Sequence, residues 1–255
     1  MRRLVALAGL VLVGACSTTT TPPGGPSNGP TKVEVLATTP HDTGAFTEGF
    51  ELVDGVLYEG TGLEGESQLR RVDPATGAVQ QKVDLPPEMF GEGIAVVGDR
   101  VWQLTYRNGI AIQRDKTSFA EVKRATYTGE GWGLCFDDKR LVMSDGTAKL
   151  TFRDPSTFTE TGSVQVTEDG QPLQMINELE CVGGSVWANV WQTDKIVRID
   201  PSTGKVTASI DASSLRPANV PKSDVLNGIA AVPGTDEFLV TGKNWPSVFR
   251  VRFVE

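Results

Sequence analysis

Residues 90–94 read Phe-Gly-Glu-Gly-Ile, and this stretch decides the fold. It places one carboxylate, Glu92, between two glycines and directly before the apolar residues 94–97, which are typical of a β-strand. A near copy occupies residues 46–50, and three looser copies occupy residues 132–134, 177–179 and 227–229. Five copies that each open a strand indicate a ring of repeats, with the position of Glu92 near its axis.

Each copy continues with the same order of elements, namely an apolar strand, a turn, a second strand, and a third strand that ends on Asp-Pro-x-Thr or a relic of it. The turns are Asp54-Gly55, Gly98-Asp99, Asp137-Asp138, Gly183-Gly184 and Pro233-Gly234. The copies follow one another at about 40 to 53 residues, which is the period of a propeller blade. Segments such as 79–83 and 206–210 fit a fourth strand. We therefore predict an all-β, five-bladed β-propeller over residues 32–255.

The last repeat has three strands before Glu255, and the segment 32–36 is an apolar-polar strand that precedes the first repeat. We expect this N-terminal strand to complete the last blade and close the ring. A β-sandwich and an open meander were the alternative folds. Neither explains five equivalent turns at blade spacing.

The first residues have the features of an export signal. Met1, Arg2 and Arg3 form a positive region, residues 4–13 are apolar, and residues 13–16 read Val-Gly-Ala-Cys. This resembles the lipobox of bacterial lipoproteins, which predicts a signal peptide over residues 1–15 and a lipidated Cys16. An ordinary signal peptide and a membrane anchor are the alternatives, although the apolar run is short for a bilayer span.

Residues 16–31 are rich in Thr, Pro, Gly and Ser and predict a disordered tether. The whole chain carries 24 Lys and Arg against 32 Asp and Glu, a net charge of −8. This balance, without clustered Lys or Arg, disfavours nucleic-acid binding. We expect an exported, periplasmic monomer that contacts the membrane only through its N-terminal lipid.

The pseudo-symmetry of the repeats predicts where functional side chains gather. A first ring at one mouth of the channel should contain Glu48, Glu92, Trp132, Asn177 and Asn227. Fourteen residues further on, the chain returns to the same face, which predicts a second ring of Gly62, Tyr106, Gly146, Trp191 and, after a longer turn, Lys243. Together they predict a pocket with aromatic walls, two carboxyls, two amides and one amine.

Each of these residues also has a structural interpretation. Glu48 and Glu92 could be solvated loop acids, although a carboxyl in an apolar pocket beside another carboxyl has a raised pKa. Asn177 and Asn227 could bind backbone groups at the strand entrance. Trp102 and Trp187 lie at matching mid-strand positions, and we expect them to pack between blades.

Several kinds of site are disfavoured by the sequence. The only histidine, His41, precedes the first repeat, which argues against a Ser-His-Asp or Cys-His unit. No His and Cys cluster has zinc-ligand spacing, and neither a Walker A pattern nor a dinucleotide fingerprint occurs. A structural calcium ion in the channel stays open. Cys135 and Cys181 fall on neighbouring blades, where a disulfide and two buried thiols both remain open.

The motifs around these residues resemble the plant and bacterial glutaminyl-peptide cyclotransferases from about Val33 to Phe253. The similar segments are residues 46–50, 90–94, 177–180, 186–191, 225–230 and 242–246. The resemblance implies a five-bladed propeller without a catalytic metal or other cofactor, which acts on peptides with an N-terminal glutamine and forms pyroglutamate and ammonia.

The resemblance also implies roles for individual residues. Glu92 corresponds to the catalytic glutamate, Asn177 to the amide and Lys243 to the amine of the family, while the substrate-binding aromatic wall corresponds to Phe46, Phe90, Trp132 and Trp191. Two positions depart from the family pattern: Glu48 stands where the plant enzymes have glutamine, and Tyr106 stands where tryptophan is common. Glu48 is expected either to bind the substrate's ammonium group or to share a proton with Glu92.

Glu92 is expected to take a proton from the substrate's α-amine and return it to the leaving amide nitrogen. Asn177 or Lys243 would stabilise the developing oxyanion. Two other functions remain open from the sequence. One is a non-catalytic envelope scaffold, and the other is a glycosidase that uses Glu48 and Glu92 as its carboxyl pair.

Overall fold

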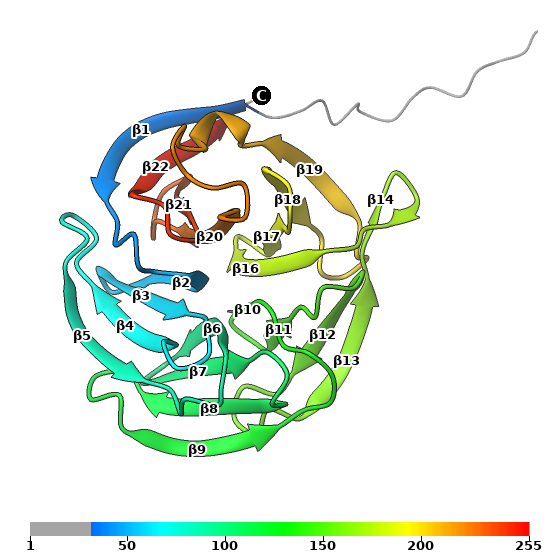
Figure 1. Ribbon diagram of the computed structural model, residues 1–255. Coiled ribbons are helices and arrows are strands. Elements are labelled where there is room, and N and C mark those ends of the chain that lie inside the picture. Colours follow the sequence, from blue (N-terminus) through cyan, green and yellow to red (C-terminus); the bar gives the residue numbers. More distant parts are fainter. Residues whose placement is uncertain (1–31, 255) are drawn as a thin grey trace, which may run out of the picture.

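The computed structural model describes residues 32–254. The predicted signal peptide (residues 1–15), the predicted lipidation site Cys16 and the rest of the predicted tether lie outside the described residues. Within residues 32–254, the chain forms five four-stranded sheets arranged as a ring around a central channel, together with one two-stranded ribbon (Figure 1). The predicted all-β, five-bladed propeller is confirmed.

Four blades follow the chain from the channel outward. Blade 1 consists of β2 (Thr47–Val53), β3 (Val56–Thr61), β4 (Gln68–Val72) and β5 (Val79–Asp84). Blade 2 consists of β6 (Gly91–Val97), β7 (Arg100–Thr105), β8 (Ile110–Asp115) and β9 (Glu121–Thr126). Blade 3 consists of β10 (Leu134–Phe136), β11 (Leu141–Met143), β12 (Lys149–Arg153) and β13 (Glu160–Gln165). Blade 4 consists of β16 (Ile176–Val182), β17 (Ser185–Val190), β18 (Lys195–Ile199) and β19 (Val206–Asp211).

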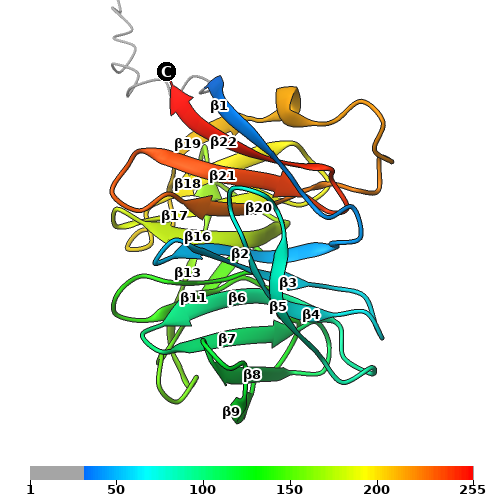
Figure 2. The same cartoon turned by 90° about the vertical axis from the view of Figure 1, so that its left-hand side faces the viewer.

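Blade 5 contains β20 (Leu226–Ala231), β21 (Glu237–Gly242), β22 (Ser247–Val254) and β1 (Lys32–Pro40). β1 pairs antiparallel with β22, so that Lys32 lies opposite Val254 and Pro40 opposite Ser247. Both views show β1 along the outer edge of this blade, next to β22 (Figures 1 and 2). The predicted closure by the N-terminal strand is confirmed.

Two elements lie outside the repeat. The ribbon of β14 (Thr167–Glu168) and β15 (Gln171–Pro172) projects between blades 3 and 4, and the 3₁₀ turn η1 (Ser213–Leu215) lies in the long connection to β20. Within residues 32–254, no helix is long and apolar enough to cross a membrane.

An aspartate stabilises the turn that separates the third and fourth strands. Asp73 Oδ1 accepts hydrogen bonds from the backbone N–H groups of Ala75 and Thr76, each at 2.9 Å. The same kind of bond is made in blades 2, 3 and 4 by Asp115, Asp154 and Asp200. A short side chain that accepts hydrogen bonds from the N–H groups that follow it favours a tight turn. This explains why Asp-Pro-x-Thr or a similar sequence occurs between the third and fourth strands of these four blades.

Glycine in the innermost strands lets neighbouring blades meet near the axis. A Cβ atom on Gly49 would lie 2.6 Å from the backbone nitrogen of Ile94 in the next blade. A Cβ atom on Gly93 would lie equally close, at 2.6 Å, to the backbone nitrogen of Leu134. Only glycine permits such an approach of two backbones. The glycine that follows each ring carboxyl is therefore required by the assembly of the ring.

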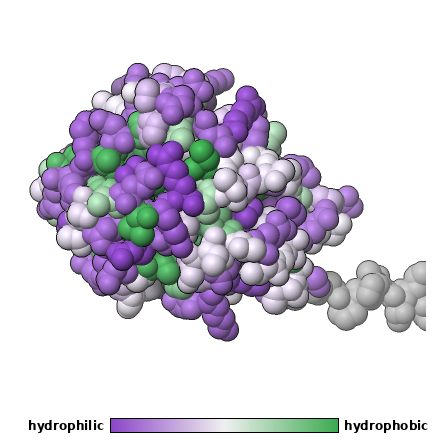
Figure 3. All heavy atoms as spheres, turned by 90° about the horizontal axis from the view of Figure 1, so that it is seen from below, coloured by the Kyte–Doolittle hydropathy of each residue, from purple (hydrophilic) through white to green (hydrophobic). Residues whose placement is uncertain are grey.

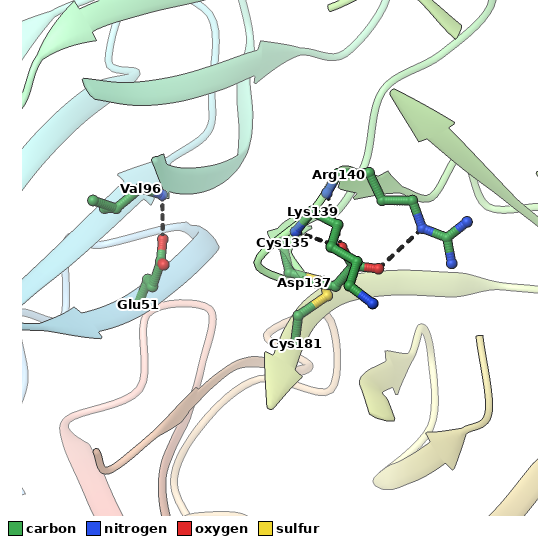
Figure 4. Close-up of a disulfide and its surroundings, with 7 residues drawn as sticks. All are labelled: Glu51, Val96, Cys135, Asp137, Lys139, Arg140 and Cys181. Carbon is green, nitrogen blue, oxygen red and sulfur yellow. Dashed lines mark hydrogen bonds and ion pairs between the residues drawn. A yellow bond between two sulfur atoms is a disulfide. The ribbon is translucent and has the colours of Figure 1, made fainter. Parts of the chain in front are cut away.

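Buried carboxyls link innermost strands across the channel. Glu178 of β16 accepts hydrogen bonds from the backbone N–H groups of Phe50 at 3.2 Å and Ile229 at 2.8 Å. Glu51 of β2 accepts from the N–H group of Val96 at 2.6 Å (Figure 4). Each bond satisfies a backbone donor of another blade.

The predicted packing residues lie between blades. Trp102 is fully buried and contacts Phe158, with ring centroids 4.9 Å apart. Trp187 is half-buried and stacks on Phe253 at 5.2 Å. Both tryptophans therefore belong to the core, as their mid-strand positions predict.

Cys135 of β10 and Cys181 of β16 form a disulfide that joins blades 3 and 4 (Figure 4). Their Cα atoms are 5.4 Å apart, which is a usual disulfide separation. The structure thus decides between the two states that the sequence left open. The two strands can approach closely because residue 133 is glycine. A Cβ atom at this position would lie only 2.1 Å from the carbonyl oxygen of Asn177.

Candidate active site

β-Bulges position four of the five first-ring side chains at one mouth of the channel. In blades 1, 2, 4 and 5, the pairing of the two innermost strands shifts between Thr47 and Gly49, Gly91 and Ile94, Ile176 and Leu179, and Leu226 and Ile229. These shifts contain Glu48, Glu92, Asn177 and Asn227, in that order. A bulge re-aims a side chain and often lies beside a functional site. The repeated motif is thus a repeated bulge.

A cavity of about 220 Å³ lies at this mouth. It is lined by side chains from all five repeats: Phe46, Glu48, Phe90, Glu92, Tyr106, Trp132, Asn177, Trp191, Ser223 and Lys243. Two glycines of the predicted second ring also lie here. A Cβ atom on Gly62 would lie 2.4 Å from the Phe90 ring, and one on Gly146 would lie 2.6 Å from the Trp132 ring. The cavity thus brings together predicted residues of both rings, with the exception of Asn227.

Aromatic side chains form a continuous wall around the cavity. Consecutive ring centroids are 6.1 Å apart for Phe46 and Phe90, 5.7 Å for Phe90 and Tyr106, 6.5 Å for Tyr106 and Trp132, and 5.4 Å for Trp132 and Trp191. Edge-to-face and tilted pairs of this kind are favourable and hold each ring in one orientation. The wall is consequently apolar and preorganised.

An ion pair lies at the Phe46 end of this wall. Lys243 Nζ lies 2.5 Å from Glu48 Oε1 and 4.4 Å from the centre of the Phe46 ring. Asn227 Nδ2 donates to Glu48 Oε2 at 3.0 Å and to the carbonyl oxygen of Thr47 at 2.9 Å. Glu48 is 2 % exposed and Lys243 is 5 % exposed. Burial raises the pKa of Glu48, and the Lys243 ammonium and the Asn227 amide oppose that rise.

Glu92 and Asn177 are the side chains whose polar atoms remain available. Both are buried, and neither Glu92 Oε2 nor Asn177 Oδ1 has a hydrogen-bond partner among residues 32–254. Burial, and then the charge of Glu48, raises the pKa of Glu92 well above its usual range, and the charge of Lys243 opposes the shift. Since buried polar atoms are normally paired, these two atoms indicate a place for a polar ligand.

A surface ion pair holds two of the aromatic walls from outside. Arg107 Nε donates to Glu130 Oε1 at 2.9 Å, and Arg107 Nη2 donates to the Tyr106 hydroxyl at 2.9 Å. Trp132 Nε1 donates to Glu130 Oε2 at 3.1 Å. Because Arg107 is largely exposed, this pair adds little stability, and its effect is to orient Tyr106 and Trp132.

A larger cavity of about 560 Å³ lies elsewhere, between the turns that follow β10 and β16. It is lined by residues such as Asp138, Arg140, Gly184 and Ser202, and by Cys181. None of the predicted site residues in the described part of the chain lies there. We therefore place the site in the smaller cavity, where unpaired buried polar atoms occur. No group of three or more His, Cys, Asp or Glu side chains within residues 32–254 is arranged to hold a metal ion.

Comparison with known proteins identifies the family. The family model described as glutamine cyclotransferase matches residues 6–253. The chain belongs to the glutamine cyclotransferase family. It is 37% identical over 227 residues to a glutaminyl-peptide cyclotransferase of Arabidopsis thaliana, a match that covers 87% of this chain and 71% of the plant protein.

Solved structures agree with this membership. A glutaminyl cyclase of Myxococcus xanthus superposes with a TM-score of 0.83 at 37% identity, over 88% of this chain and 97% of that one. The Pan2 WD40 domain of Neurospora crassa matches with a TM-score of 0.50 at 9% identity, over 82% of this chain and 77% of that one. The second likeness concerns the fold alone.

The cavity of this glutamine cyclotransferase differs from the predicted pocket in two respects. Asn227 is fully buried and lies behind Glu48, so it is separated from the cavity by the side chain it holds. Ser223 lines the cavity although the sequence analysis did not single it out. It comes from the connection between β19 and β20, which is longer than the corresponding connections of the other repeats and therefore gave no periodic signal. The roles assigned to the remaining residues stay predictions.

Proposed function

We propose that this protein converts the N-terminal glutamine of peptides and proteins to pyroglutamate with release of ammonia, without a metal ion, and that Glu92 is its general base and acid. The observation that carries the proposal is the Glu92 carboxyl, which is 5 % exposed, faces an aromatic cavity and keeps one oxygen without a partner among the described residues. The family and its Arabidopsis and Myxococcus relatives support the reaction.

The reaction needs one group that takes a proton and later returns it. The neutral α-amine of the substrate attacks the carbon of the γ-carboxamide to close a five-membered ring, and Glu92 takes the proton that this nitrogen loses as the new C–N bond forms. The C–N bond to the amide nitrogen then breaks, and Glu92 returns the proton so that this nitrogen leaves as ammonia. A group that must take a proton and later return it works best with a pKa near the working pH, and burial raises the pKa of Glu92 in that direction.

Lys243 and Asn177 can bind the other polar groups of the reacting substrate. The Lys243 ammonium can donate to the carboxamide oxygen, on which negative charge develops during attack. Asn177 Oδ1, which has no partner within residues 32–254, can accept an N–H of the bound substrate. Glu92, Asn177 and Lys243 therefore form the proposed catalytic set.

The walls favour the folded shape of a glutamine side chain. Cyclisation is intramolecular, so a cavity that holds the amine near the carboxamide contributes much of the rate. A volume of about 220 Å³ is below the ~300–1,000 Å³ of usual small-molecule sites. It suits one compact side chain, which disfavours the glycosidase alternative.

The test measures ammonia release from a Gln-initiated dipeptide in the presence of EDTA. We expect wild type to keep its turnover with EDTA and Glu92→Gln to lose about 10²–10⁴-fold in kcat with an unchanged circular dichroism spectrum. Glu160→Gln, at an exposed position of β13, is the matched control and should behave as wild type. Loss of activity with EDTA would remove the metal-free mechanism, and near-normal turnover of Glu92→Gln would remove its assignment as base.

The scaffold alternative has less support. The large hydrophobic residues that are exposed within residues 32–254 lie on different strands and loops, namely Val35 and Leu36 on β1, Val79 on β5, Val122 on β9, and Met175. On the outer face that Figure 3 shows, hydrophobic residues occur as separate spots between hydrophilic ones. A docking surface for a large partner would bring such residues together.

We further propose, from the sequence of residues 1–31, that the protein is exported to the periplasm and anchored to the bacterial envelope through a lipidated Cys16. The expected result is incorporation of labelled palmitate into wild type and its loss in Cys16→Ser. Equal labelling of both would contradict the anchor.

A further inference from the structure

Two buried carboxyls share the cavity but have different surroundings. Glu48 has both oxygens occupied, Oε1 by Lys243 at 2.5 Å and Oε2 by Asn227 at 3.0 Å. Glu92 has no hydrogen bond at Oε2 to any residue in 32–254. The cation and the amide donor bond directly to Glu48 and favour its ionised form, whereas Lys243 acts on Glu92 through its charge without a hydrogen bond. Of the two carboxyls, Glu92 is therefore the one that binds a proton more readily.

The same contacts limit what Glu48 can do. Each oxygen of Glu48 already accepts a hydrogen bond, and Glu48 is only 2 % exposed, so little of this carboxyl is left for a substrate ammonium. Neither oxygen bonds to Glu92 among the described residues. Both roles that the sequence suggested for Glu48, ammonium binding and proton sharing, are thus disfavoured by its actual partners.

Glu48 gives the Lys243 ammonium a partner of opposite charge. Without Glu48, its ammonium would be a buried cation over the Phe46 ring, 4.4 Å from the ring centre, with Glu92 as the remaining carboxyl of the cavity. An ammonium attracted to Glu92 would hold that group ionised and would occupy the oxygen that the reaction needs.

We infer that Glu48 is a positioning residue which, held by Asn227, anchors and neutralises the Lys243 ammonium and so keeps Glu92 as the carboxyl that exchanges protons with the substrate. This inference rests on the proposed function and adds to it the reason for a second carboxyl in the site. It also assigns Asn227 to the support of Glu48 rather than to direct contact with the substrate.

The inference predicts a change in pH dependence. The charged and titratable groups that act on Glu92 are Glu48 from β2, Lys243 after β21 and Glu130 before β10, with the hydroxyls of Tyr106 and Tyr127 nearby. Glu48→Gln removes a negative charge that raises the pKa of Glu92 and leaves the positive charge of Lys243, which lowers it. The loss of the Glu48 charge and the remaining charge of Lys243 both favour the ionised form of Glu92. The pKa of Glu92 should therefore fall, so that it takes up its proton at lower pH.

The experiment is the pH profile of kcat/KM for ammonia release by wild type, Glu48→Gln and the control Glu160→Gln. Glutamine has the size of glutamate and keeps an oxygen that can bind Lys243. If Glu48 had only a structural role, the pH profile of Glu48→Gln would therefore match that of wild type. We expect the acid limb to move down by about 1 pH unit or more in Glu48→Gln and to stay in place in the control. A limb that is unmoved or moves up in Glu48→Gln overturns the inference while leaving the proposed function intact.

A second measurement does not need Glu48→Gln to fold. The infrared band of protonated carboxyls is compared between wild type and Glu92→Gln near pH 6. Loss of band intensity in the variant supports a proton on Glu92, and an identical band overturns the inference. Absence of ammonia release by wild type would instead remove the proposed function, and the inference with it.

Discussion

Gly62 shows how a residue without a side chain determines the shape of the cavity. A Cβ atom there would lie 2.4 Å from the ring of Phe90 and 3.1 Å from Cγ of Glu48, so the ring and the ion pair would both have to move. We predict that Gly62→Ala lowers kcat/KM by about 10–100-fold, because small displacements of positioning groups have effects of that size. The measurement is steady-state ammonia release.

Gly162→Ala is the control for this change. Its Cβ atom would be 3.7 Å from the nearest side-chain atom, in Phe152, which is an ordinary contact. We expect wild-type activity from this variant. Equal activity of Gly62→Ala and Gly162→Ala would contradict the view that Phe90 must keep its present position.

For single residues, the sequence predicts which side chains lie near the channel mouth better than it predicts which of them bind one another. Repeat symmetry was enough to bring Glu48, Glu92 and Lys243 to one mouth of the channel. It did not reveal that Lys243 binds Glu48 rather than Glu92, because that choice depends on how each bulge turns its side chain. The same limit explains why Asn227 was expected in the wall and lies behind it.

The disulfide is the one covalent cross-link between side chains of different blades among residues 32–254, and it joins innermost strand β10 to innermost strand β16. It closes a loop with a sequence separation of 46 residues, for which a stabilisation of about 2–4 kcal/mol is typical. We predict that replacing both Cys135 and Cys181 by Ser lowers Tm by roughly 4–16 °C in a domain of this size. Differential scanning calorimetry measures the shift.

Activity at 25 °C should survive this change. Cys181 lies four residues beyond Asn177 on β16, which places it about 13 Å from the cavity end of the strand. Reductant should lower the Tm of wild type and leave that of the double variant unchanged. Equal Tm values for wild type and the double variant would show that the link adds no stability.

Among the elements, the strands that repeat were predictable and those that do not repeat were missed. Turn dipeptides and Asp-Pro-x-Thr marked the strands of each blade, because each turn is stabilised by its own residues. The ribbon of β14 and β15 and the connection that contains η1 occur once each, so no second copy indicated their structure. The Cys135–Cys181 pair stayed open for a different reason, since the distance between two blades is not encoded locally.

For the molecule as a whole, the buried channel acids determine how stability depends on pH. Burial raises the pKa of Glu178 and Glu180 well above the usual range and raises the pKa of Glu51 to about 8. In the unfolded chain these groups release their protons near pH 4.3. Between about pH 4.5 and 8 the folded state thus binds more protons than the unfolded state, and stability falls as pH rises.

We therefore predict a higher Tm at pH 5 than at pH 8, where each 1 kcal/mol of this linkage corresponds to about 2–4 °C. The net charge of −8 acts in the same direction through general repulsion, so a variant must separate the two causes. Glu51→Gln retains an acceptor for Val96 and removes one titration, so its Tm should vary less with pH than that of wild type. An equal pH dependence in both proteins would assign the effect to overall charge.

The pairing of β1 with β22 joins the beginning of the fold to its end. Pro40 meets Ser247, a residue that the ribosome adds about 200 residues later, which takes roughly 10–40 s at 5–20 residues per second. During that interval β1 has no partner, and Val35 and Leu36 belong to an unpaired strand edge, a feature that promotes aggregation. The ring cannot close while the chain is still being made, and so the propeller is completed only after translation of its last strand.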